Sequence, residues 1–250
     1  MEGKKHAGII LAAGRGSRLK ELSLEQPKPM IMVNEMTIIS NLVNHLINGK
    51  MEQIVIIVGY KAERLKEHLA PFHKKVNLIF IENSLFDTTN NIYSLWLAKH
   101  FLLEGFFLFE ADVFIEESIV HDFINTQRED AMLVDKFTPK MNGTVVNFDA
   151  EKKVLGMYLN KDQEETFNYS DKFKTVNFYK ISHSFAQSFF IDKLDQHIAQ
   201  KDTASYYELI IKEAIESNHN FYAIETGNRK WYEIDTHEDL VIAQNLFNPR

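Results

Sequence analysis

The sequence predicts an α/β fold built on a mainly parallel sheet with helices on both faces. In the first half of this 250-residue chain, short apolar runs alternate with helical patterns. Strand–helix alternation of this kind implies right-handed crossovers between parallel strands. With 45% hydrophobic residues and no linker or repeat, the chain can form one large core. We therefore expect a single domain over residues 1–250, although an end at Asn248-Pro249-Arg250 directly after a helix would also suit a domain of a longer polypeptide.

The strands expected in the first half are short, continuous apolar runs, which are typical of buried parallel strands. They cover residues 7–12, 54–58, 76–81 and 106–109. Helical spacing of apolar residues predicts intervening helices over 38–47, 61–70 and 92–99, and Gly49 is a plausible stop for the first of them.

The middle of the chain has a different pattern, with short strands separated by turns rather than by helices. These strands are expected at residues 131–136, 144–148, 154–159 and 175–181. They indicate a small antiparallel extension of the sheet. Helices at about 184–199 and 205–217, a strand pair near 221–225 and 231–234, and a final helix at about 237–247 complete the expected order.

Composition excludes several classes of protein. The formal net charge of -7 argues against a protein that coats nucleic acid, which would usually present a basic face. The absence of cysteine excludes disulfides and cysteine-based zinc sites. The apolar stretch from Ala7 to Ala13 is too short for a membrane span and lacks the parts of a signal peptide. A cytoplasmic protein with neither a nucleic-acid nor a membrane partner is expected.

A glycine-rich loop follows the first strand, in the segment Leu11-Ala12-Ala13-Gly14-Arg15-Gly16. Small residues let backbone N–H groups approach a polyphosphate, and Arg18 and Lys28 add fixed positive charge. A dinucleotide fingerprint needs a third small residue where Leu19 stands, and the Gly-Lys-Ser/Thr of a P-loop is absent. A tight turn without function is the alternative, but the basic residues favour phosphate binding.

Two aspartates lie just beyond predicted strands, Asp112 after 106–109 and Asp235 after 231–234. Ligands of open α/β sheets bind outside the carboxyl ends of strands, so both should face the glycine-rich loop. Mg²⁺ usually takes one or two protein carboxylates beside phosphates and water. We expect the pair to hold Mg²⁺. The alternative is a structural role, since Asp235-Thr236-His237-Glu238 has the character of a helix capping box.

Nucleotide recognition is expected at two further segments, Gly59-Tyr60 and Asn90-Asn91-Ile92-Tyr93-Ser94-Leu95. The Asn91 amide and the Ser94 hydroxyl are able to hydrogen-bond to the edge of a base. A structural alternative for Asn91 is to cap the helix beginning at Ile92, and the two roles do not exclude each other.

Candidates for binding a second substrate lie in the last third of the chain. Tyr206, Tyr207 and Glu208 begin a predicted helix, and aromatic faces with a carboxylate suit an ammonium group. Lys172 and Lys174 flank Phe173, and strand alternation would place both on one face to bind a phosphate or phosphonate. Core packing of the tyrosines and solvation of the lysines are the alternatives.

The segment Leu-Ala-Ala-Gly-x-Gly-Ser-Arg-Leu (11–19) followed by Pro-Lys-Pro (27–29) resembles the signature of nucleoside-diphosphosugar-transferase-like nucleotidyltransferases. Within that family the chain is most similar to phosphocholine and 2-aminoethylphosphonate cytidylyltransferases. The resemblance implies a Rossmann-like three-layer sandwich with a mixed sheet of about seven strands. It implies that residues 12–16 hold base and phosphates, that Arg18 and Lys28 act on the triphosphate, and that Asp112 and Asp235 bind Mg²⁺.

The Asn-Asn-x-Tyr-Ser-Leu segment (90–95) is similar to a motif of the CTP-specific phosphocholine enzymes, and this likeness is the reason to expect CTP. Those enzymes place a tryptophan beside the quaternary ammonium, whereas this chain has Asn142-Gly143-Thr144 in that region. A primary amine can hydrogen-bond instead of using an aromatic cage, so 2-aminoethylphosphonate is favoured over phosphocholine.

The expected reaction is transfer of CMP from CTP to a small phosphonate or phosphate amine, with release of pyrophosphate. The rivals are a sugar-1-phosphate nucleotidyltransferase, a glycosyltransferase and a non-catalytic nucleotide-binding module. The sequence does not fix the oligomeric state, and a homodimer or a fused partner domain are both compatible with it.

Overall fold

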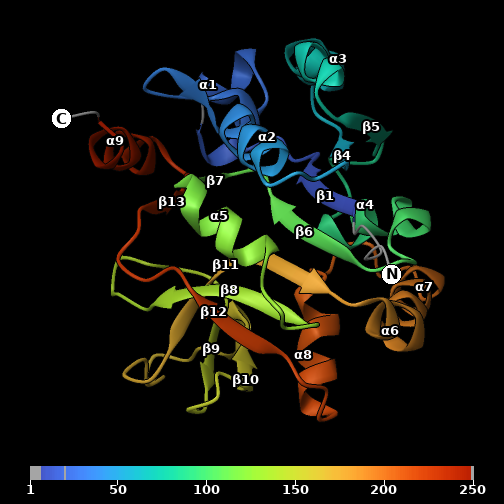
Figure 1. Cartoon of the computed structure of the whole chain (residues 1–250), viewed down its shortest axis with the longest axis vertical. Coiled ribbons are helices and arrows are strands. Elements are labelled where there is room, and N and C mark those ends of the chain that lie inside the picture. Colours follow the sequence, from blue (N-terminus) through green and yellow to red (C-terminus); the bar gives the residue numbers. More distant parts are fainter. Residues whose placement is uncertain (1–6, 20, 249–250) are drawn as a thin grey trace.

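A nine-stranded mixed sheet forms the centre of the computed structural model, which describes residues 7–19 and 21–248 (Figure 1). Seven strands run in the order β10-β9-β11-β6-β1-β4-β5, while β8 pairs with β11 and β12 pairs with β8. The strands β6, β1, β4 and β5 are parallel, and β11 joins β6 antiparallel. The bounds are β1 (Ala7–Ala12), β4 (Gln53–Val58), β5 (Asn77–Glu82), β6 (Phe106–Glu110), β8 (Ala131–Lys136), β9 (Val145–Phe148), β10 (Val154–Tyr158), β11 (Phe173–Ile181) and β12 (Tyr222–Glu225).

Helices cover both faces of this sheet, which makes three layers. Alternation along β1 explains the two cores: Ile9 and Leu11 pack on one side, and Ile10 and Ala12 on the other. The first side is covered by α4 (Asn91–Leu97), α6 (His183–Phe185), a π-helical turn (Ala186–Phe190), α7 (Ile191–Ala199) and α8 (Glu208–Glu216). The second is covered by α2 (Ile38–Asn48), α3 (Ala62–Leu69) and α5 (Glu117–Ile124). The predicted α/β fold with its antiparallel extension is confirmed.

A smaller layer lies beyond the carboxyl end of β6. There β13 (Trp231–Glu233) pairs antiparallel with β7 (Val113–Ile115), and α9 (His237–Leu246) packs beside the hairpin of β2 (Met32–Val33) and β3 (Met36–Thr37). The Ile234 N–H donates to the Asp112 carbonyl at 2.9 Å. This hydrogen bond brings the end of β13 back to the end of β6. Asp112 and Asp235, which are 123 positions apart in the sequence, thereby become neighbours.

Two sequence predictions about the fold are wrong. Residues 221–225 and 231–234 do form strands, but they do not pair with each other: β12 extends the main sheet beside β8, and β13 pairs with β7. The pattern also missed α5, β7, the β2–β3 hairpin and the short α1 (Glu21–Glu25), because elements of two to eight residues give too little periodicity. In the described part of the chain, no helix is long and apolar enough to cross a membrane.

Candidate active site

A cleft of about 360 Å³ lies at the carboxyl ends of the parallel strands, where α/β sheets bind their ligands. The glycine-rich loop after β1, the segment between β5 and α4, and the ends of β6 and β13 form its walls. Sequence analysis had singled out these lining residues: Leu11, Ala12, Ala13, Gly14, Gly16, Arg18, Lys28, Asn91, Ser94, Asp112, Tyr206, Glu208 and Asp235. Asn90, from the segment expected to recognise the nucleotide, also lines it. The other lining residues are not assigned a role by the sequence: Ser17, Pro29, Asn83, Phe86, Thr89, Glu110, Ala111, Asn177 and Glu233.

Gly16 allows the loop to close onto Lys28. Its φ of +68° lies in the left-handed region that favours glycine, and a Cβ atom there would lie 2.7 Å from the Lys28 Cβ. Gly14 differs, because it has no neighbour within 4 Å of a built Cβ and borders the open cleft. Gly16 therefore positions the lysine, while Gly14 leaves room for a ligand.

Replacing Gly16 with alanine is expected to displace Lys28 and reduce turnover by at least about tenfold, because a 2.7 Å contact between carbon atoms forces one of them to move. Gly227→Ala is the matched control. Gly227 has nearly the same φ, +69°, but nothing lies within 4 Å of its built Cβ. Both variants should lose similar thermal stability from backbone strain, so a turnover loss of equal size in Gly227→Ala would contradict the positioning role of Gly16.

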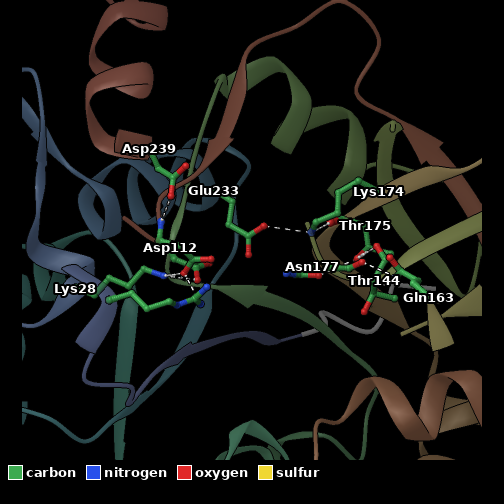
Figure 2. Close-up of polar contacts among 12 residues, drawn as sticks. Lys28, Asp112, Thr144, Gln163, Lys174, Thr175, Asn177, Glu233 and Asp239 are labelled. Carbon is green, nitrogen blue, oxygen red and sulfur yellow. Dashed lines mark hydrogen bonds and ion pairs between the residues drawn. The ribbon is translucent and has the colours of Figure 1, made fainter. Parts of the chain in front are cut away.

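The Lys28 ammonium group lies between two carboxylates (Figure 2). Its Nζ is 2.8 Å from Asp112 Oδ2 and 2.7 Å from Asp235 Oδ1, and Arg18 Nη2 is 2.8 Å from the same Asp235 oxygen. Burial opposes the charge of Lys28, but Asp112 and Asp235 outweigh it and raise the pKa of the lysine above its ordinary value. Burial likewise opposes the charge of Asp235, yet Lys28 and Arg18 lower its pKa. Both pKa shifts favour the charged forms of Lys28 and Asp235, and the sequence-predicted residues converge.

The capping role proposed as an alternative for Asp235 belongs to its neighbours. Thr236 is the N-cap of α9, and its backbone N–H and that of Asp235 donate to Asp239 Oδ2 at 2.8 and 3.1 Å. The Asp235 side chain is therefore available to the cleft. In Asp112, Oδ1 is buried and has no hydrogen-bond partner among the described residues. Free carboxylate oxygen beside a cationic loop suits a hard cation bound together with a triphosphate.

Carboxylates form one wall of the cleft. Glu110, Glu208 and Glu233 all line the cleft, and burial raises the pKa of each. Glu208 Oε2 is buried without a partner among the described residues, and Glu110 Oε1 accepts a 3.3 Å bond from the Asn91 amide. Glu233 Oε2 lies 3.2 Å from Lys174 Nζ, and the charge of the same lysine also favours the ionised form of Glu208. Buried carboxylates with so few donors favour a cationic ligand group.

Asn91 and Ser94 line the cleft, but both already have partners. Asn91 Oδ1 accepts from the Tyr207 N–H at 3.0 Å, and Ser94 Oγ accepts from Asn83 Nδ2 at 3.0 Å. Asn90, not Asn91, is the N-cap of α4, so the capping alternative for Asn91 is wrong. Asn91 instead connects the start of α4 to the start of α8.

Six sequence-predicted site residues do not line the cleft: Arg15, Gly59, Tyr60, Lys172, Lys174 and Tyr207. Of these, Lys174 contacts a cleft residue through its ion pair with Glu233. Gly59 and Tyr60 lie behind the loop, where the Tyr60 N–H donates to the Ala13 carbonyl at 3.0 Å. The Lys172 ammonium pairs with Asp171 and lies 5.2 Å from the centre of the Tyr158 ring, so the two lysines do not meet on one surface.

The sequence contains a pattern that could have identified two of the missed cleft residues, Glu110 and Glu233. Glu110-Ala111-Asp112 and Glu233-Ile234-Asp235 share the spacing Glu-x-Asp, and alternation along an extended chain directs both acids of each motif to the same side. No comparable sequence pattern identifies Asn177 as a cleft residue. Its direction depends on an irregularity in β11 that the sequence pattern does not reveal.

The geometry has counterparts in known proteins. The family described as "Nucleotidyl transferase" matches residues 7–248. The CMP-5'-(3-aminopropyl)phosphonate synthase of Streptomyces rubellomurinus is 27% identical over 242 residues, 96% of this chain and 38% of that protein. The chain thus spans well under half of that relative. The 2-aminoethylphosphonate cytidylyltransferase of Lancefieldella rimae is 28% identical over 212 residues, 80% of this chain and 83% of that protein.

Among solved structures, the CTP:phosphocholine cytidylyltransferase from Streptococcus pneumoniae superposes with a TM-score of 0.80. The match covers 97% of this chain and all of that chain at 22% identity, which supports the shared fold. The resemblance seen in the glycine-rich loop thus extends through the whole cleft-bearing domain, and the chain belongs to the nucleotidyl transferase family.

Proposed function

We propose that the chain is a cytidylyltransferase that transfers CMP from CTP to a small phosphonate or phosphate amine and releases pyrophosphate, with 2-aminoethylphosphonate the favoured acceptor and phosphocholine the next. The observation that carries the proposal is the Lys28 ammonium held 2.8 and 2.7 Å from Asp112 and Asp235, in a cleft lined by a glycine-rich loop and by further carboxylates. Membership of the family supports nucleotidyl transfer. The choice of cytidine is supported by the names of the relatives.

In this reaction an oxygen of the acceptor's phosphonate or phosphate attacks the α-phosphorus of CTP. The new P–O bond forms as the bond to the β-phosphate oxygen breaks, and pyrophosphate leaves with the electron pair. Both reactants are anions, so catalysis depends on positioning and on neutralising charge. Arg18 and Lys28 supply that positive charge, and the backbone of residues 12–16 approaches the phosphates closely.

Mg²⁺ fits the same site. Asp112 and Asp235 would hold it, because their carboxylates converge and Asp112 Oδ1 has no partner among the described residues. No cluster of three or more His, Cys, Asp or Glu side chains suited to a metal ion occurs in residues 7–19 and 21–248, so phosphates and water would complete the shell. When bound, the ion would neutralise charge on the triphosphate.

Position 143 supports a primary amine rather than a quaternary ammonium. A Cβ atom on Gly143 would lie 2.9 Å from the Lys174 Cε, so the lysine side chain occupies the space beside this glycine. No tryptophan lines the cleft in the described chain. Buried carboxylates remain, and they match an ammonium group that can donate hydrogen bonds.

A survey of pyrophosphate release tests the function directly. CTP, ATP, GTP and UTP are each combined with 2-aminoethylphosphonate, phosphocholine, phosphoethanolamine and glucose-1-phosphate, with and without Mg²⁺. Release only with CTP, Mg²⁺ and an amine-bearing acceptor is expected. Turnover confined to the sugar phosphate would indicate the rival sugar-nucleotide reaction. If none of the four acceptors supported pyrophosphate release, the proposal would be overturned.

Glu208→Gln is expected to raise the acceptor KM by about 10- to 100-fold, the range for a lost hydrogen bond to a charged group. The CTP KM should stay nearly constant. The melting temperature should hold or rise, because the amide replaces a buried carboxylate whose Oε2 has no hydrogen-bond partner among the described residues.

The pH dependence gives a second readout for Glu208. Burial raises the pKa of Glu208, so in the wild type the carboxylate gains a proton, and the acceptor KM rises, as the pH falls through that value. Glu208→Gln should lack this rise. An unchanged acceptor KM in the variant, or an equal change in both KM values, would contradict an ammonium site at Glu208.

A further inference from the structure

The backbone of β11 is irregular where it passes the cleft. In its pairing with β8, Thr175 lies opposite Val134 and Tyr179 opposite Met132, so four steps along β11 match two along β8. Asn177 lies inside this bulge with φ +61°, in the left-handed region that favours glycine. Asparagine is among the few other residues that tolerate this conformation, and bulges often redirect a side chain next to an active site.

The bulge places Asn177 next to the reacting groups. Phe178 pairs with Phe109 of the antiparallel neighbour β6, so the residue before Phe178 reaches the level of Glu110 and the turn to Asp112. Asn177 lines the cleft together with these acids. In Figure 2, Asn177 lies on the side of Thr175 that faces Glu233 and Asp112.

The orientation of the Asn177 amide is fixed by its neighbour. The Thr175 hydroxyl, itself fully buried, lies 2.9 Å from Asn177 Oδ1 and 3.2 Å from the Thr144 carbonyl. Its single proton donates to the nearer Asn177 Oδ1, because the Thr144 carbonyl already accepts from the Thr175 N–H at 3.0 Å. With the oxygen engaged, the amide nitrogen carries its two N–H groups toward the cleft. The Lys174 ammonium, a strong donor near Asn177 in sequence, is already engaged. It donates to the Thr175 carbonyl at 2.6 Å and lies 3.2 Å from Glu233 Oε2.

We propose that Asn177 binds an anionic oxygen of the acceptor's phosphonate or phosphate group and so holds it for attack. This inference rests on the proposed function and adds a residue to its acceptor site. An acidic wall binds the ammonium end of such a molecule but repels its anionic end, and the Asn177 amide supplies uncharged donors among Glu110, Glu233 and Asp112. An amide at this point orients the acceptor without neutralising the carboxylates.

The test compares three variants. Asn177→Gly keeps the left-handed backbone and removes the amide, whereas Asn177→Asp keeps the shape and replaces the donor with an acceptor. Asn218→Gly is the control, because Asn218 has a similar φ of +65° and does not line this cleft. Asn177→Gly should raise the acceptor KM by about 10- to 100-fold and Asn177→Asp by more, while the CTP KM changes less than about twofold. Asn218→Gly should behave as the wild type.

Ethylphosphonate, which lacks the amine, shows which end of the acceptor Asn177 contacts. Its inhibition constant against 2-aminoethylphosphonate should rise in Asn177→Gly by the same factor as the acceptor KM, but should stay constant in Glu208→Gln. An unchanged acceptor KM in Asn177→Gly, an equal rise in the CTP KM, or an unchanged inhibition constant would overturn the role of Asn177. Absence of turnover in the wild type would instead overturn the proposed function itself.

Discussion

Replacing Asp112 with alanine is expected to reduce kcat by about a thousandfold or more while the protein stays folded. The loss is large because Asp112 lies beside the transferring phosphorus in the proposed reaction, where charge must be stabilised as it develops. The fold survives because Lys28 keeps its second partner, Asp235, at 2.7 Å. Pyrophosphate release under saturating CTP and acceptor measures the effect, and thermal unfolding measures the stability. Asp235→Ala should behave similarly.

Asp195→Ala provides the control for this prediction. Asp195 also accepts from a lysine, with Lys99 Nζ at 2.8 Å, but it lies on α7 away from the cleft. Its loss should leave kcat unchanged. A near-native rate in Asp112→Ala would contradict the assignment of this aspartate to the reacting centre. A lower Mg²⁺ affinity in Asp112→Ala, measured by the Mg²⁺ dependence of the melting temperature with CTP bound, would support its role as a metal ligand.

Much of the fold could be predicted from local patterns because most of its buried strands are continuous apolar runs. The segments predicted at 7–12 and 131–136 match β1 and β8 residue for residue. Pairing partners could not be predicted in the same way. Residues 222–225 join β8 in parallel, an arrangement set by packing between distant segments and not by the local sequence.

The part of the cleft around Lys28 was more predictable than the part proposed to bind the acceptor. Asp112 and Asp235 follow from the general rule that ligands lie at the carboxyl ends of strands, and the structure brings them to one lysine. Lys172 and Lys174 show the limit of strand alternation. Lys174 turns inward to Glu233 because Gly143 leaves room for it, whereas Lys172 precedes β11 and pairs with Asp171. Neither arrangement is visible in the spacing of the two lysines.

Replacing Lys28 with alanine is expected to lower kcat by about 100- to 1,000-fold, with a smaller change in the CTP KM. The ammonium contributes most when negative charge shifts toward the leaving pyrophosphate, so its loss should affect the transition state more than ground-state binding. The variant also leaves Asp112 and Asp235 without the cation between them, although Asp235 retains Arg18 at 2.8 Å. A lower melting temperature, partly restored by Mg²⁺ and CTP, is therefore expected.

Lys66→Ala is the control that shows whether the loss of kcat is specific to Lys28 or follows from removing any ion-paired lysine. Lys66 bridges Glu63 at 2.7 Å and Glu82 at 3.2 Å on the surface, so its removal should leave kcat unchanged. If Lys28→Ala raised only the CTP KM, the lysine would contribute to binding alone. Its position between two carboxylates would then be structural, because a cation placed between Asp112 and Asp235 relieves their mutual repulsion.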